Sequence, residues 1–195
     1  RYLTRDMEAT MEDRLHAISP AYKEETRPIF RQKSKVVAKK VFNDTKVTDH
    51  HAIIPTDEPL YLGDLDNDER KLYDIVVKRF LTIFYPPCKY ESIYASIDVA
   101  GETFIARETA VIDKGFKVVS GKDEEKPSSK HLPAFKTGQS FEVKDISVEK
   151  KLTEPPLRLS ESDLLQRMEK YGLGTPATRA DIIEKILSSE LIERQ

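Results

Sequence analysis

The spacing of apolar residues changes twice along this chain, and this change constrains the fold more than any other feature. Up to about residue 85 the apolar residues recur every third or fourth position, which is typical of one face of a helix. Between about residues 89 and 153 they alternate with polar residues, as in a half-buried strand. Beyond Pro155-Pro156 the helical spacing returns. We therefore expect an α+β, multi-domain chain with helical segments at both ends and an antiparallel β-rich region between them.

The first part predicts two well-marked helices. Thr4 is a suitable N-cap residue for the first helix. The second helix begins after Asp66 or Asn67 and ends before Pro86-Pro87, because a helix rarely continues into a proline pair. The apolar residues expected to face the core are Met7, Met11, Leu15 and Ile18 in the first helix and Leu72, Ile75, Val76, Phe80 and Ile83 in the second.

The middle part predicts an antiparallel hairpin. Alternating residues run from Ile93 to Val99, Ala100-Gly101 can form the turn, and a second strand runs from Thr103 to Val111. The stretch from Gly121 to Lys130 has no apolar residue to bury, so we expect a solvated loop there.

A second alternating stretch follows that loop, but its parity changes. Phe141 and Val143 share one parity, whereas Ile146 and Val148 share the other. A continuous strand would place the two pairs on opposite faces. We therefore predict a β-bulge or a change of sheet near Asp145.

The third part predicts a helix-turn-helix or winged-helix-like layout. Ser160 can cap the first helix, and Gly172 or Gly174 supplies the left-handed residue that ends it. Thr175-Pro176 then opens the second helix. The predicted buried positions are Leu164, Leu165, Met168 and Tyr171 in the first helix and Ile182, Ile183, Ile186 and Leu187 in the second.

Composition excludes several classes of protein. The formal net charge of -2 gives no support for nucleic-acid binding by whole-molecule basicity, so any attraction for phosphate must be local. Cys88 is the only cysteine, which rules out an intramolecular disulfide and a thiolate zinc cluster and fits a reducing cytoplasm. No apolar run is long enough to cross a bilayer, so no membrane partner is expected.

Candidate chemistry concentrates on His50 and on the start of the last helix. A helix N-terminus presents unpaired N–H groups, so Thr175, Thr178 and Arg179 beside it can hold a phosphate; the alternative is that the threonines only cap the helix. His50 can contact a phosphate as a cation or can be an ordinary hydrogen-bonded histidine. Metal binding by His50-His51 is not expected, because adjacent side chains in an extended segment point apart.

Other polar clusters allow plain interpretations. The acidic residues between Asp64 and Glu69 lack a calcium-loop pattern and are expected to cap the next helix. Tyr2 has no base or metal nearby in the sequence to activate it as a nucleophile. A basic run could follow a DNA backbone or could be a solvated face. Its members are Arg27, Arg31, Lys33, Lys35, Lys39, Lys40 and Lys46.

Three segments in this order resemble type IA DNA topoisomerases of the topoisomerase III kind. They are RYLTRD (Arg1 to Asp6), VTDHHAIIPT (Val47 to Thr56) and EPPLRLSESDLLQRMEKYGLGTPATRADII (Glu154 to Ile183). By this resemblance His50 contacts the scissile phosphate and His51 is structural. Thr175, Thr178 and Arg179 lie in the single-strand DNA groove. The nucleophilic tyrosine lies just upstream of Arg1, and Tyr2 matches a later, non-catalytic position.

The resemblance also implies domains and an activity. Residues 1–85 would be the remainder of the catalytic-tyrosine domain, 86–157 a β-rich arch or hinge segment, and 158–195 the helical start of the single-strand-groove domain. The parent enzyme would cleave, pass and reseal single DNA strands through a 5'-phosphotyrosine, with Mg²⁺ and without ATP. This piece is expected to be inactive alone and to hold no cofactor. Its expected partner is DNA, mainly single-stranded, and no small-molecule substrate is expected.

Two other interpretations remain open at this stage. A helix-turn-helix DNA-binding regulatory module would account for Leu159 to Gln195 alone, and it should select a duplex sequence. A purely structural hinge should have no affinity for DNA. The topoisomerase interpretation instead predicts a preference for single strands with little sequence choice.

Overall fold

The structure, a computed structural model, describes residues 2–33, 35–47, 50–120 and 136–194. The chain forms two compact units, Arg1–Thr137 and Gly138–Gln195, which are described separately. The predicted loop from Gly121 to Lys130 lies outside the described residues. The domain boundaries at residues 85 and 157, which the resemblance implied, refer to the domains of a whole topoisomerase, and they stay a prediction.

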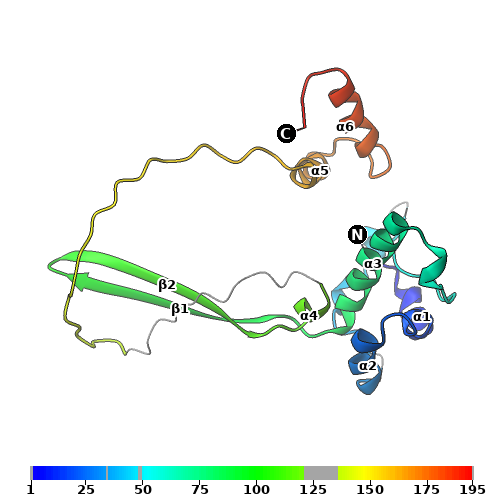
Figure 1. The fold of residues 1–195 in the computed structure, drawn as a ribbon, viewed down its shortest axis with the longest axis horizontal. Coiled ribbons are helices and arrows are strands. Elements are labelled where there is room, and N and C mark those ends of the chain that lie inside the picture. The colour runs from blue at the N-terminus through cyan, green and yellow to red at the C-terminus, as the bar shows by residue number, and fades with distance from the viewer. Residues whose placement is uncertain (1, 34, 48–49, 121–135, 195) are drawn as a thin grey trace. The chain divides into compact units, whose positions relative to one another are not determined.

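The first unit contains four α-helices and a two-stranded antiparallel sheet among its described residues (Figure 1). The helices are α1 (Met11–Ile18), α2 (Lys23–Arg31), α3 (Asn67–Leu81) and α4 (Lys117–Ser120), and the strands are β1 (Lys89–Val99) and β2 (Glu102–Asp113). Short 3-10 helices span Arg5–Thr10, Lys39–Val41, Asp44–Lys46, Leu62–Asp64 and Thr82–Phe84. The mixed helix and strand content agrees with the predicted α+β class.

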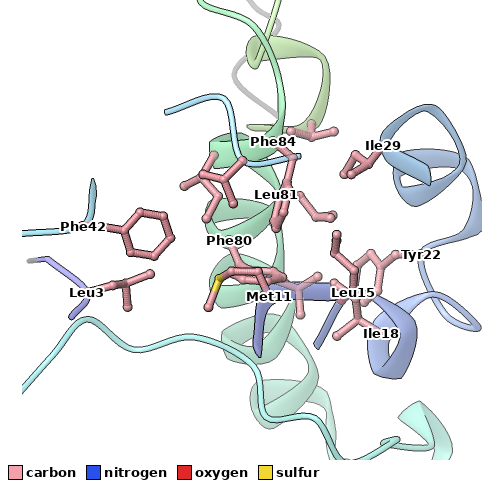
Figure 2. Packing of buried hydrophobic residues seen from close by; sticks show 14 residues of the cluster. Leu3, Met11, Leu15, Ile18, Tyr22, Ile29, Phe42, Phe80, Leu81 and Phe84 are labelled. Atoms are coloured by element: carbon pink, nitrogen blue, oxygen red, sulfur yellow. The ribbon is translucent and has the colours of Figure 1, made fainter. Parts of the chain in front are cut away.

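The core of this unit lies where α1 meets α3. Figure 2 shows Met11, Leu15 and Ile18 of α1 gathered in one cluster with Phe80 and Leu81 of α3. The periodicity of the first helix is therefore confirmed at these positions. The helix begins later than predicted, because the residues from Arg5 to Thr10 form a 3-10 helix and the side chain of Thr4 makes no capping hydrogen bond.

Helix α3 starts as predicted and buries only part of the predicted face. The Asp66 carboxylate accepts hydrogen bonds from the backbone N–H groups of Asp68 and Glu69 and thereby caps the helix. Leu72 and Ile75 are 66% and 64% exposed, so their predicted burial is wrong. The predicted burial of Phe80 and Ile83 is confirmed, and Tyr73, Val77, Leu81 and Phe84 pack inward beside them. Both sets have helical spacing, and periodicity alone does not decide between two neighbouring apolar faces.

The predicted hairpin is confirmed. Its strands pair in register from Val99 with Glu102 to Tyr90 with Val111, with an irregularity between Lys89 and Tyr90. Ala100 and Gly101 have φ values of 54° and 87°, so both turn residues are left-handed, as a two-residue hairpin turn requires.

The open end of the hairpin is attached to the helical core. The backbone N–H of Phe116 donates to the carbonyl of Pro86 at 2.8 Å, and α4 directly after it buries Val119 in the core cluster. The chain thus leaves the core at Pro86-Pro87 and returns to it after Gly115.

The second unit begins with an extended stretch, residues 138–159, that forms no helix or strand. The predicted bulge near Asp145 is therefore wrong, because no described strand pairs with this stretch. Phe141, Val143, Ile146 and Val148 are all exposed. Alternating apolar residues give a segment the capacity to be a strand, but a strand forms only beside a partner.

Two helices follow, α5 (Glu161–Lys170) and α6 (Arg179–Ser188), in the predicted helix-turn-helix order. Ser160 caps α5 with Asp163, and this hydrogen bond lowers the pKa of the Asp163 carboxyl. Met168 and Ile183 are buried, as predicted. Leu165 and Tyr171 are exposed, which corrects their predicted burial. Among the described residues of this unit there is no strand, and the winged-helix expectation stays a prediction.

Candidate nucleic-acid interface

The segment that contains His50 is tied to the start of the chain. The backbone N–H of Ala52 donates to the carbonyl of Tyr2 at 2.8 Å, and the next residue, Leu3, forms a parallel bridge with Phe42. Leu3 and Phe42 are both buried, so this three-segment arrangement rests on the core. The segments RYLTRD and HHAI, which are far apart in the sequence, therefore lie side by side in the structure.

The histidine pair itself is exposed, and the residues after it anchor it. The Nδ1–H of His51 donates to the carbonyl of Ala52 at 2.6 Å, which supports the structural role expected for His51. The carbonyl of Pro55 accepts a hydrogen bond at 2.6 Å from the Arg14 guanidinium of α1. The backbone that follows His50 is thus fixed by hydrogen bonds, and His50 itself is exposed at the surface. Its contact with a phosphate stays a prediction.

Tyr2 has a different environment from that of a nucleophile. The Lys46 ammonium donates to the Tyr2 hydroxyl at 3.2 Å and lies 4.8 Å from the centre of its ring. Among the described residues, the side chain that contacts this hydroxyl is a cation, which is not a general base. The arrangement is consistent with a non-catalytic Tyr2 and with Lys46 adding positive charge near the His50 segment.

The turn before α6 brings together the three residues that the sequence singled out in this unit. The Thr178 hydroxyl accepts the backbone N–H of Thr175 at 2.9 Å and lies 3.1 Å from the Thr175 hydroxyl. The Nε–H of Arg179 donates to the carbonyl of Leu173 at 3.2 Å. Gly174 has a φ of 63°, and a side chain there would collide with Ile182. The turn is therefore fixed by its own hydrogen bonds.

The first turn of α6 has backbone donors without partners. The Thr178 side chain makes no capping hydrogen bond to the helix, contrary to the capping alternative for this residue. Among the described residues, the N–H groups of Ala180 and Asp181 have no acceptor. Two open N–H groups, two hydroxyls and a guanidinium with its four Nη hydrogens can together bind an anion, although the side chain of Asp181 opposes it.

The two candidate sites belong to different units. His50 lies in the first unit and the Thr175–Arg179 turn in the second, so each is described by itself. Within the described part of the chain, no group of three or more His, Cys, Asp or Glu side chains is arranged to hold a metal. The acidic residues near Asp66 act as expected, because Asp66 and Glu69 cap α3 and Asp68 pairs with Lys71 at 2.9 Å.

Two contacts at the candidate site were not predicted from the sequence, although Lys46 itself was named there as part of the basic run. Arg14 holds the segment after His50, and Lys46 contacts Tyr2. Arg14 is 41 residues from its partner Pro55 and Lys46 is 44 residues from Tyr2, so no local spacing could indicate either pair. The segment from Val47 to Thr56 marked the candidate site in the sequence, but it did not indicate the groups that hold it.

Among the described residues, no helix has the length and apolar character needed to span a membrane.

Comparisons with known proteins agree on one family. The family described as "DNA topoisomerase" matches residues 1–195. The DNA topoisomerase 3 of Bacillus licheniformis is 38% identical over 100% of this chain and 30% of the relative. The Bacillus subtilis protein of the same name is 36% identical with the same coverage, and that of Staphylococcus aureus strain USA300 is 37% identical over 98% of this chain and 29% of its own.

The chain thus spans about 30% of the length of these relatives. A match along the whole chain does not favour a regulatory module limited to the last two helices. It agrees with the resemblance carried by the His50 segment, the Thr175 turn and the start of the chain. The chain therefore belongs to the DNA topoisomerase family, and its relatives are type IA enzymes of the topoisomerase III kind.

Proposed function

We propose that this chain is part of an ATP-independent, cytoplasmic topoisomerase III that cleaves a single DNA strand through a 5'-phosphotyrosine, passes another strand and reseals the break. The observation that carries the proposal is the family match over residues 1–195 together with 38% identity to a DNA topoisomerase 3. The part of the protein described here contributes DNA binding and the structure of the gate. We expect it to be inactive alone, because the resemblance matches Tyr2 to a non-catalytic position and not to the nucleophile.

In this proposal the Thr175–Arg179 turn binds the backbone of the single strand. The open N–H groups of Ala180 and Asp181 would donate to phosphate oxygens. The hydroxyls of Thr175 and Thr178 would join them by exchanging the hydrogen bonds that they make with each other and with the Thr175 carbonyl for bonds to phosphate. Such contacts do not read base edges, so they suit binding with little sequence choice.

His50 has the supporting catalytic role. A protonated imidazole beside the scissile phosphate would stabilise negative charge as the phosphoryl group is transferred. The hydrogen bond between Ala52 and Tyr2 supports this role, because it holds the His50 segment beside the residues that the resemblance places just after the nucleophile.

The Mg²⁺ implied by the family does not fit this chain alone. Its described residues gather no set of three ligands of the kind a metal needs. No step is therefore assigned to magnesium here, and its requirement is proposed only for the complete protein.

The DNA-binding part is tested by fluorescence anisotropy of the 195-residue chain with labelled single-stranded and duplex oligonucleotides. We expect single strands to bind more tightly, and His50→Ala and Thr178→Ala to weaken that binding. Thr103→Ala is the control, since Thr103 is exposed and is not placed in the interface. Preference for a duplex sequence would instead support a regulator.

The enzymatic part is tested by relaxation of supercoiled DNA with Mg²⁺. A complete protein containing this chain should relax DNA, and its His50→Ala variant should be slower by about 10²-fold, the typical contribution of one group that stabilises transition-state charge. The 195-residue chain alone should show no relaxation. Activity of this chain alone would overturn the proposal of an inactive piece.

A further inference from the structure

Helix α2 presents a row of three cations on one side. Lys23, Arg27 and Arg31 are spaced by four residues, are all exposed, and form no side-chain hydrogen bond or ion pair with any described residue. Some other cations of the same unit are engaged, since Lys39 pairs with Glu8 and Lys78 pairs with Asp74 at 2.8 Å. The charge of the α2 row is therefore available to a partner.

The three cations line an open depression of about 670 Å³. Its other lining residues are Ser19, Pro20, Thr26 and Phe30. Phe30 is half-buried, packs on the core and stacks on the His16 ring with a centroid distance of 4.8 Å and an interplanar angle of 25°. Thr26 is buried, and its hydroxyl donates a hydrogen bond to the carbonyl of Tyr22 at 2.8 Å. The depression thus has a fixed, largely apolar floor and a cationic rim.

The spacing of the rim suits a polyanion. Four residues of an α-helix rise by about 6 Å, which is comparable with the separation of successive phosphates in an extended strand. Glu24 and Glu25 follow Lys23 by about 100° and 200° around the helix, so Glu25 lies well away from the row and Glu24 borders it. Phe30 and His16 add an aromatic surface on which a base can stack, which an acidic peptide or a duplex would not use.

We propose that this depression on α2 is an additional binding site for single-stranded nucleic acid, separate from the His50 segment and from the Thr175–Arg179 turn. The phosphates contact Lys23, Arg27 and Arg31, and a base packs against Phe30. The inference rests on the proposed function for its choice of nucleic acid as the partner. It extends the DNA-binding surface to residues that the family resemblance did not single out.

The charge contacts are tested with the 195-residue chain and a labelled oligo(dT) over a range of salt concentrations. Arg27→Glu and Arg31→Glu should each weaken binding by about fivefold or more and lower the slope of log affinity against log salt by about 1. Arg79→Glu is the matched control, because Arg79 is an exposed arginine on α3 without a side-chain partner in the described structure. It should leave both quantities unchanged, and circular dichroism checks that all variants are folded.

The stacking contact is tested by photo-crosslinking to an oligonucleotide that carries 5-iodouracil. Trypsin cleaves after Lys23 and after Arg31 but not between Arg27 and Pro28, so the expected crosslinked peptide is Glu24–Arg31. Phe30→Leu should remove the crosslink and leave the salt slope unchanged, since it keeps all three charges.

Three results would overturn the inference: no binding of oligo(dT), effects of the α2 variants equal to that of Arg79→Glu with no crosslink, or tighter binding of poly-glutamate than of oligo(dT). The last result would identify an acidic protein partner instead. These outcomes are independent of DNA relaxation by the complete protein. The site on α2 can therefore fail while the topoisomerase proposal stands, and the reverse can also occur.

Discussion

Two glycines in the first unit take left-handed backbone angles, and they differ in what surrounds them. Gly101 forms the hairpin turn with a φ of 87°, and a side-chain carbon there would meet nothing within 4 Å. Gly115 has a φ of 49°, and the same carbon would lie 2.6 Å from the carbonyl oxygen of Pro87. Both positions favour glycine for its backbone freedom, but only Gly115 also needs the missing side chain.

Gly115→Ala should therefore destabilise the first unit much more than Gly101→Ala. The left-handed angle alone costs an alanine about 1 kcal/mol, and the collision with the backbone at Pro86-Pro87 raises the cost at Gly115 to about 3 kcal/mol. Urea unfolding followed by circular dichroism measures both values. Equal losses for the two variants would mean that the hairpin does not close against Pro86-Pro87.

At the residue scale, sequence reasoning succeeded where the cause is local. Asp66, Ser160 and the Ala100-Gly101 turn were predicted because caps and turns depend on residues within about four positions. The contact between Arg14 and Pro55 was not predictable, because folding and not local spacing brings these two residues together. The roles of His50 and Thr178 came from a family resemblance, and their phosphate contacts stay predictions.

At the scale of elements, α3 shows how a helix with two apolar faces chooses one. Leu72 and Ile75 continue the helical pattern on the outer side, but the core formed with α1 lies against Val77 and Leu81. The choice depends on where α1 and α4 pack, which is tertiary information that the α3 sequence does not contain.

Two leucines of α3 test this choice directly. Leu81 is 0% exposed and Leu72 is 66% exposed. Leu81→Ala should cost about 3 kcal/mol of unfolding free energy, because it removes buried apolar atoms and leaves a cavity. Leu72→Ala should change the unfolding free energy by less than about 0.5 kcal/mol. Chemical denaturation of the two variants gives both numbers, and a large loss for Leu72→Ala would restore the predicted face.

Tyr22, between α1 and α2, couples these helices to α3. It is buried, and its hydroxyl donates to the Asp74 carboxylate at 3.4 Å. Burial and then the charge of Asp74 raise the pKa of Tyr22 well above its ordinary value of 10.0. Burial also raises the pKa values of Tyr73 and Tyr85, and the Tyr85 hydroxyl donates to the carbonyl of Glu25 in α2.

This junction should make the first unit sensitive to alkali. The folded state favours neutral tyrosines, so its stability is fully present below the ordinary pKa of 10.0 and is lost as pH rises above it. Urea unfolding between about pH 8 and about pH 11 measures this effect. At the lower pH, Tyr22→Phe should lower the free energy of unfolding by about 1 kcal/mol, because a hydrogen bond is lost. At the higher pH, it should make the decline of the free energy of unfolding shallower by up to about 1.4 kcal/mol per pH unit. An unchanged decline would exclude Tyr22 as a cause.

At the scale of the whole chain, the two units have unequal cores. The first unit buries a cluster that draws on residues from Leu3 to Val119, whereas the described residues of the second bury only Met168 and Ile183 among their apolar side chains. The sequence predicted helices and a hairpin in the right order, since each has its own periodicity. It could not predict that residues 138–159 stay without a strand partner, because alternation does not specify what a segment pairs with.

This difference predicts the order of tryptic cleavage of the chain. Lys144, Lys150 and Lys151 are exposed on a stretch without helix or strand, so trypsin should cut after them first. Bonds after Lys78 and Arg79 lie in α3 and require unfolding before cleavage. The variant Leu81→Ala should accelerate the α3 cuts and leave the early cuts unchanged, because only the α3 cuts depend on core stability. Mass spectrometry of a time course assigns each cut, and α3 cuts as early as those after Lys144 would show that the first unit is not the more stable one.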